Sequence, residues 1–137
     1  MSREANLAAQ EHLAEHLNAG DIDTAVESFA EDAVDHDAAS GQGPGRDGFR
    51  TFFQTLATAF SDAHIEPAHI VADDEHVAIA YTLSGTHDGD FHGIAATGRR
   101  IEVRGVQIGR FESGKIAERW GSSDELGIVQ QLGVEPA

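Results

Sequence analysis

Residues 77–84 read Val-Ala-Ile-Ala-Tyr-Thr-Leu-Ser, with bulky apolar side chains at every second position and small ones between them. A period of two is typical of a β-strand with one buried face. A Gly-rich segment separates this strand from a second predicted strand over 100–112, and the turn Ser113-Gly114 leads into a third over 115–120. The alternation of the second strand slips near Gly105, which predicts a β-bulge and a bend there.

The first part of the chain has helical spacing instead. Ala5, Ala9, Leu13 and Leu17 recur every four residues and predict one helix. Three further helices are predicted over 22–29, 49–60 and 124–132. The first of these three starts after the capping residue Asp21.

Helices that precede a run of antiparallel strands indicate the α+β class. We therefore expect N-terminal helices packed on a strongly curved antiparallel sheet, which forms a cone around an internal pocket. A chain of 137 residues is long enough for one such domain, 1–137.

Charge and composition exclude several classes of partner and several kinds of chemistry. The chain has 24 acidic and 9 basic residues, a formal net charge of −15 and no cysteine. This balance argues against nucleic acid and anionic membranes as partners, and the missing thiols exclude disulfides and thiolate chemistry. No apolar stretch approaches a membrane span and no secretion signal is visible, so we expect a soluble, cytoplasmic protein. The acidic surface predicts a halophilic source, which thermal melts in low and in molar KCl would test.

Two short motifs do not establish a site. His12 to His16 spells H-x-x-E-H, a pattern that some zinc peptidases use, but no third ligand follows and solvated histidines on an amphipathic helix explain it better. Gly43 to Gly48 fits G-x-G-x-x-G without the βαβ frame that dinucleotide binding needs. We therefore expect no metal site and no nucleotide site.

Polar residues cluster where the pocket is expected: His36, Tyr81, His87, Gln107 and Asp124. Imidazole and carboxylate groups are the usual means of proton transfer near neutral pH. Structural alternatives exist for four of them. Asp124 is also placed to cap the last helix, Tyr81 and Gln107 could satisfy buried hydrogen bonds, and His36 could be a solvated loop residue.

Three segments together resemble the SnoaL-like polyketide cyclase family, which belongs to the nuclear transport factor two-like superfamily. They are 84–100, 108–118 and the C-terminal group formed by Trp120, Asp124 and 131–133. The resemblance implies the cone fold, a small hydrophobic carbonyl compound as ligand, and a homodimer through the open sheet face. It also implies an intramolecular aldol ring closure without a cofactor, driven by an aspartate near the end of the last strand.

The chain departs from its relatives at the acid–base positions. The family aspartate aligns with Gly121 and a family histidine aligns with Gln107, whereas His87 and Asp124 match family positions. Two functions therefore stay open: a cyclase, isomerase or lyase, and a non-catalytic ligand-binding or dimerisation domain.

For the catalytic alternative, the predicted acid–base residues are Asp124 and His36, with His87 as a polar partner. The predicted substrate-binding residues are Phe29, Phe53, Tyr81, Phe91, Gln107 and Trp120.

Overall fold

The computed structural model describes residues 2–39 and 41–133. Helix α1 (Arg3–Asn18) begins at Ser2, whose hydroxyl accepts a hydrogen bond from the Ala5 amide at 3.1 Å. This side chain satisfies one of the amide groups that have no partner inside the helix. No helix in the described part of the chain is long and apolar enough to cross a membrane.

The second predicted helix is shorter than expected. Helix α2 (Ile22–Ala25) and a 3₁₀ turn (Val26–Ser28) end at Phe29, where strand β1 (Phe29–Asp35) starts. Within β1, Phe29 and Ala33 are buried and the polar residues between them are exposed. This strand was not predicted, and it carries part of the candidate site.

Helix α3 (Gly45–Ala59) follows β1 and is rich in phenylalanine. Gly45 has φ +68°, and a Cβ at this position would lie 2.5 Å from the Glu31 carbonyl oxygen. A glycine is therefore required for the chain to enter α3 so close to β1.

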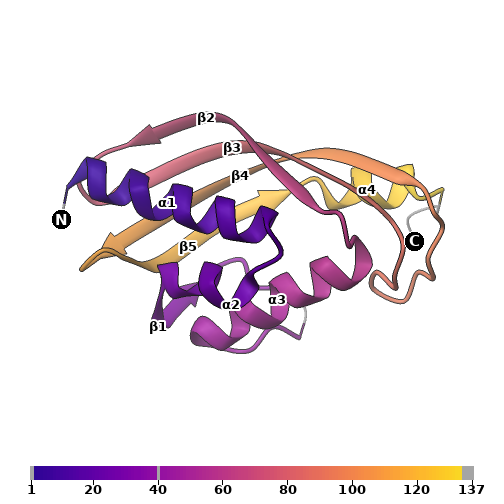
Figure 1. The fold of residues 1–137 in the computed structure, drawn as a ribbon, viewed down its shortest axis with the longest axis horizontal. Helices are drawn as coiled ribbons and strands as arrows, with labels where there is room; N and C mark the ends of the chain where they lie inside the picture. The colour runs from indigo at the N-terminus through magenta and orange to yellow at the C-terminus, as the bar shows by residue number, and fades with distance from the viewer. Residues whose placement is uncertain (1, 40, 134–137) are drawn as a thin grey trace.

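Four further strands complete a five-stranded sheet in the order β1-β5-β4-β3-β2 (Figure 1). They are β2 (His64–Ala72), β3 (His76–Thr86), β4 (Arg100–Glu112) and β5 (Lys115–Ser123), and α4 (Glu125–Gln131) follows them. The α+β class with helices packed on a sheet is confirmed. One detail differs from the prediction, because β1 pairs with β5 in parallel and the sheet is mixed.

The predicted bulge at Gly105 is wrong. The pairing of β3 with β4 is continuous from His76↔Arg110 to Thr86↔Arg100, and the irregularity of β4 lies between Arg110 and Phe111 on its β5 side. The apparent slip arose because β4 exposes Val106 and Ile108 on one face while Val103 is buried on the other.

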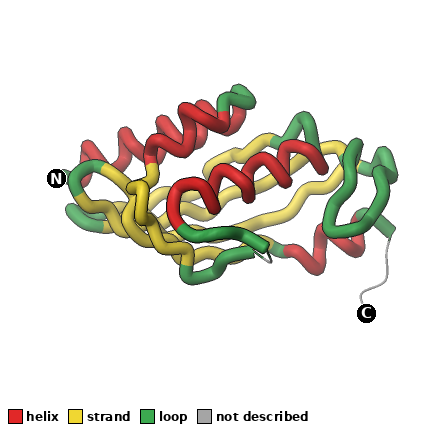
Figure 2. Tube along the Cα trace, turned by 90° about the horizontal axis from the view of Figure 1, so that it is seen from below, coloured by secondary structure: helices red, strands yellow, loops and turns green. Residues whose placement is uncertain are grey.

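The helices cover one face of the sheet. Helix α1 lies against β2 and β3, and α3 lies against β1 (Figures 1 and 2). Leu13 of α1 and Phe49 of α3 pack with Phe29, Val77 and Phe111 in one core cluster. The opposite face of the sheet exposes apolar side chains, among them Val34, Val71, Val106 and Ile108.

Candidate functional site

A pocket lies between α1, α3 and the covered face of the sheet. The empty space inside it, open solvent included, is about 970 Å³. A mostly apolar cleft with a few polar groups is the usual form of a small-molecule site. Most of the wall is apolar and includes Leu17, Phe52, Phe53, Leu56, Ile79 and Leu83.

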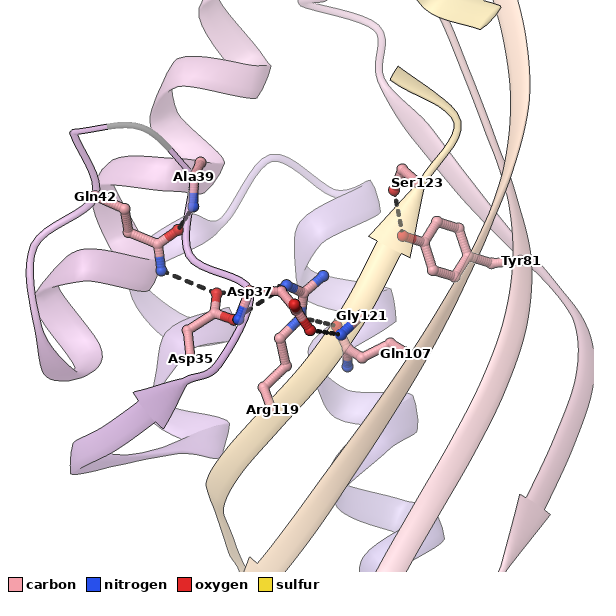
Figure 3. A network of polar contacts seen from close by, with 9 residues as sticks. All are labelled: Asp35, Asp37, Ala39, Gln42, Tyr81, Gln107, Arg119, Gly121 and Ser123. Carbon is pink, nitrogen blue, oxygen red and sulfur yellow. Dashed lines mark hydrogen bonds and ion pairs between the residues drawn. The ribbon is translucent and has the colours of Figure 1, made fainter. Parts of the chain in front are cut away.

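One end of the pocket is polar and is built from β1, β4 and β5 (Figure 3). Arg119 Nη1 donates to Asp35 Oδ1 at 3.2 Å, and Arg119 Nε donates to Gln107 Oε1 at 3.2 Å. The side chains of Arg119 and Asp35 are 11% and 7% exposed. The pair is therefore largely removed from water. Away from water, each charge is stabilised mainly by the other.

Asp35 has two further partners that fix its carboxylate. Gln42 Nε2 donates to Oδ2 at 3.0 Å, and the backbone amide of Asp37 donates to Oδ1 at 3.0 Å. Asp35 can occupy this position because β1 runs parallel to β5 and brings it opposite Arg119 in the sheet. The last residue of the unpredicted strand thus supplies a buried carboxylate to the pocket.

Gly121 explains how the guanidinium fits. A Cβ at position 121 would lie 2.6 Å from Arg119 Nη2 and 2.8 Å from Cζ, so any side chain there would displace the guanidinium. The Gly121 amide donates to Asp37 Oδ2 at 2.9 Å (Figure 3). Of the two carboxylates at the end of β1, Asp37 therefore holds the Gly121 backbone and Asp35 holds the guanidinium beside it.

A second polar pair lies further along the same face. The Tyr81 hydroxyl and Ser123 Oγ are 2.6 Å apart, and both residues line the pocket (Figure 3). The Tyr81 ring passes over Gly105, where a Cβ would lie 2.4 Å from the phenol oxygen. The glycine that suggested a bulge instead makes room for this ring.

Four of the six predicted substrate-binding residues line the pocket: Phe53, Tyr81, Phe91 and Gln107. Phe29 is fully buried in the core instead, stacked on Phe49 at 4.0 Å between ring centroids. Trp120 lies on the opposite face of the sheet, because it alternates with Arg119 and pairs with the exposed Ile108.

The two predicted acid–base residues and their predicted polar partner His87 do not converge on the pocket. His36 stacks on Trp120 and bonds to Glu118 at 3.0 Å on the uncovered sheet face. Asp124 caps α4 by accepting from the Gly127 amide at 2.8 Å, which was its structural alternative.

His87 is fully buried outside the pocket wall and joins the two ends of a loop. Its Nδ1 accepts from the Thr97 amide at 3.1 Å and lies 2.9 Å from Thr97 Oγ1. Its backbone amide also donates to the Arg99 carbonyl. Because the same loop carries Phe91 and His92 to the pocket, His87 supports part of the wall without reaching the interior.

Asp35 and Arg119 were not identified from the sequence. Strand periodicity offers no signal for Asp35, because Glu31 and Asp32 break the apolar alternation of β1 and Asp37 lies in the turn that follows the strand.

Both histidines of the H-x-x-E-H motif have polar partners within the protein. His12 Nδ1 lies 3.0 Å from Ser28 Oγ, and His16 Nδ1 donates to the His12 carbonyl at 2.8 Å. Across residues 2–39 and 41–133, no group of three histidine, aspartate or glutamate side chains is arranged to hold a metal ion.

Comparison with known proteins gives consistent results. The profile of the SnoaL-like polyketide cyclase family matches residues 7–132. Aklanonic acid methyl ester cyclase DnrD from Streptomyces peucetius is 33% identical over 90 residues, which are 65% of this chain and 62% of DnrD. The chain thus matches less than two thirds of that relative's length.

Two solved structures share the fold over almost the whole chain. TsrD from Streptomyces laurentii superimposes with a TM-score of 0.89 at 25% identity, covering 98% of this chain and 99% of TsrD. Wild-type IdmH from Streptomyces antibioticus gives a TM-score of 0.81 at 31% identity, covering 94% and 99%.

Proposed function

Because this chain belongs to the SnoaL-like polyketide cyclase family, we propose that it closes a ring in a small, apolar carbonyl compound by acid–base catalysis in this pocket. Asp35 is the proposed acid–base residue. The observation that carries the proposal is a buried carboxylate at the polar end of an otherwise apolar pocket. The other carboxylate of the pocket wall, Glu125, is exposed to solvent.

The proposed step is an intramolecular aldol closure without a cofactor. The Asp35 carboxylate takes a proton from a carbon flanked by carbonyl groups, and the enolate carbon attacks a ketone carbon of the same molecule. A carbon–carbon bond forms while the ketone π bond becomes an alkoxide, which takes the proton back from Asp35. Since the proton returns, the reaction is an isomerisation and needs no external acid or base.

The neighbouring groups have separate roles in this proposal. Arg119 is a positioning residue that holds Asp35 and balances its charge. The Gln107 amide nitrogen is available to donate to the developing oxyanion, and the Tyr81 hydroxyl can also donate to it when Ser123 donates to the Tyr81 oxygen. The apolar walls exclude water, which strengthens these interactions.

The Gly-for-Asp replacement receives a physical explanation in this proposal. Here Gly121 stands where the family has its acid–base aspartate, and Asp35, from the neighbouring parallel strand, takes over that role. The support is geometric, because Arg119 fills the space beside Gly121 and connects it to Asp35.

Turnover of aklanonic acid methyl ester, the compound in the name of the relative DnrD, tests the proposal. We expect Asp35→Asn to lower the rate of ring closure by roughly 10²- to 10⁴-fold. Asp124→Asn is the matched control, because asparagine also caps helices and Asp124 lies outside the pocket wall, so its rate should match the wild type. A wild-type rate in Asp35→Asn together with a lowered rate in Asp124→Asn would assign the acid–base role to Asp124.

The second candidate is a non-catalytic pocket that binds a small apolar ligand. The ion pair favours it, since an arginine already engages the one buried carboxylate of the described pocket wall. Ligand binding without turnover by the wild-type protein would decide for this candidate.

We also propose that two copies pair through the uncovered sheet face. Val106 and Ile108 of β4 are 53% and 39% exposed there, beside the small residues Ala78 and Ala80 of the paired strand β3. A group of exposed apolar side chains on one face is typical of an interaction surface.

A further inference from the structure

Gln10 is a polar residue in the covered face of α1 and lines the pocket. It is only 5% exposed, and its neighbours one turn further along the helix are the pocket residues Leu13 and Ala14. A glutamine amide is rarely buried at such a position without hydrogen-bond partners.

The Gln10 amide has no such partner. Its Oε1 is buried and accepts no hydrogen bond, and its Nε2 donates none to any residue within 2–39 and 41–133. An unpaired buried polar group is destabilising, because the group loses water without gaining a replacement. In the pocket wall, a bound ligand can provide that replacement.

Three other polar side chains of the pocket wall already have a partner within the protein. Gln107 Oε1 accepts from Arg119, Asp35 pairs with Arg119, and the Tyr81 hydroxyl pairs with Ser123. Among these pocket side chains, Gln10 is the one whose whole amide remains available to a ligand.

We infer that Gln10 is a specificity residue, which selects ligands that bring a hydroxyl group to the α1 side of the pocket. A hydroxyl group complements both polar atoms of the amide, since it can donate to Oε1 and accept from Nε2. The inference rests on the proposed function only in using the same pocket. It adds that the compound carries a free hydroxyl group in addition to its reacting carbonyl groups.

A site built to hydrogen-bond a hydroxyl rejects an analogue that lacks it, because the protein's polar group is then left unpaired. Calorimetric binding of three small ketones tests this: 6-hydroxy-1-tetralone, 6-methoxy-1-tetralone and 1-tetralone. The wild type should bind the hydroxy compound roughly 10-fold tighter than either analogue. Equal affinity for all three, or no binding of the hydroxy compound, would overturn the inference.

Gln10→Leu assigns the preference to its residue. The variant should bind the three ketones with similar affinity, and its ligand-free melting temperature should equal or exceed that of the wild type, because a buried oxygen without a hydrogen-bond partner is removed. An undiminished preference for the hydroxy compound in Gln10→Leu would overturn the assignment.

Asn6→Leu is the matched control on the same helix. Asn6 is also buried with an unpaired oxygen, but its Nδ2 bonds to the carbonyls of Asp73 and Asp74 and it does not line the pocket. We expect this variant to lose stability and keep the hydroxyl preference.

Asp35→Asn separates the inference from the proposed function. It should keep the hydroxyl preference while losing ring closure. Wild-type protein that shows the preference without turnover would support the inference and contradict the proposed reaction, whereas wild-type turnover without the preference would do the opposite.

Discussion

The guanidinium of Arg119 occupies the space that a side chain at position 121 would take. A Cβ on Gly121 would lie 2.6 Å from Arg119 Nη2, well inside van der Waals contact. From this position Arg119 holds Asp35 on one side and Gln107 on the other. The candidate site therefore depends on an absent side chain as much as on the groups that are present.

The close approach of Gly121 to the Arg119 guanidinium should make any larger residue at position 121 destabilising. Gly121→Ala should displace the guanidinium, weaken the pair with Asp35 and lower the free energy of unfolding by about 1–3 kcal/mol, as overpacking does. Gly109→Ala is the control on the same face, because its Cβ would meet Ile116 and Phe111 at an ordinary 3.5 Å. Urea unfolding of both variants measures the difference, and equal costs would contradict this explanation of Gly121.

Loss of the arginine should be more costly. Arg119→Met leaves the Asp35 carboxylate buried without its charged partner, which should lower the free energy of unfolding by about 3–5 kcal/mol at neutral pH. The double variant Asp35→Asn/Arg119→Met should lose less than the sum of the two single variants, because neither charge then remains alone. Additive losses in denaturant titrations would show that the pair is not coupled.

Acid should weaken the link between the α3–β2 turn and the end of β3. The Thr86 amide donates to Asp62 Oδ1 at 2.6 Å, the Thr86 hydroxyl donates to Oδ2 at 2.9 Å, and these bonds lower the pKa of Asp62 from its usual value. A pKa depressed on folding contributes stability above the unfolded-state pKa, about 3.9 for an aspartate, and this stability is lost as the pH falls through the lower folded-state pKa.

Asp62→Asn tests this contribution through melting temperatures between pH 7 and pH 2. The variant should melt below the wild type at pH 7, and the gap should narrow below about pH 4 and close as the pH falls through the lowered pKa of Asp62 in the folded protein. A gap that stays constant over the whole range would assign the effect to lost geometry and not to the charge.

The proposed dimer places Val106 in a contact between two copies. Val106→Asp brings a carboxylate to each side of that contact and should convert the protein to a monomer, since like charges and buried unpaired carboxylates both oppose association. Light scattering should give twice the chain mass for the wild type and the single-chain mass for the variant. A monomeric wild type would rule the contact out.

Local periodicity was sufficient for the elements whose two faces differ clearly. Strand β3 alternates bulky and small residues and α1 repeats apolar residues every four positions, so both were identified from the sequence alone. Strand β1 was missed because Glu31 and Asp32 interrupt its apolar pattern, and its pairing with β5 joins residues more than 80 positions apart. No local pattern encodes such a contact.

Strand β2 and the orientation of β5 were not predicted either. An aromatic residue beside an arginine suggests that Trp120 faces the interior, yet Arg119 faces the pocket and Trp120 the uncovered side. The arginine is tolerated inside because Asp35 and Gln107 satisfy it, and those partners come from other strands. The site therefore follows from tertiary pairing, whereas the fold class follows from the sequence pattern.

Hydrogen–deuterium exchange at the acidic carbon of the substrate tests the central claim most directly. The wild-type protein in D₂O should incorporate deuterium between the carbonyl groups of aklanonic acid methyl ester faster than buffer does, as followed by mass spectrometry. Asp35→Asn should bind the ester and show only the buffer rate. Exchange at the wild-type rate in Asp35→Asn would contradict the account, because the proton would then be taken by another group.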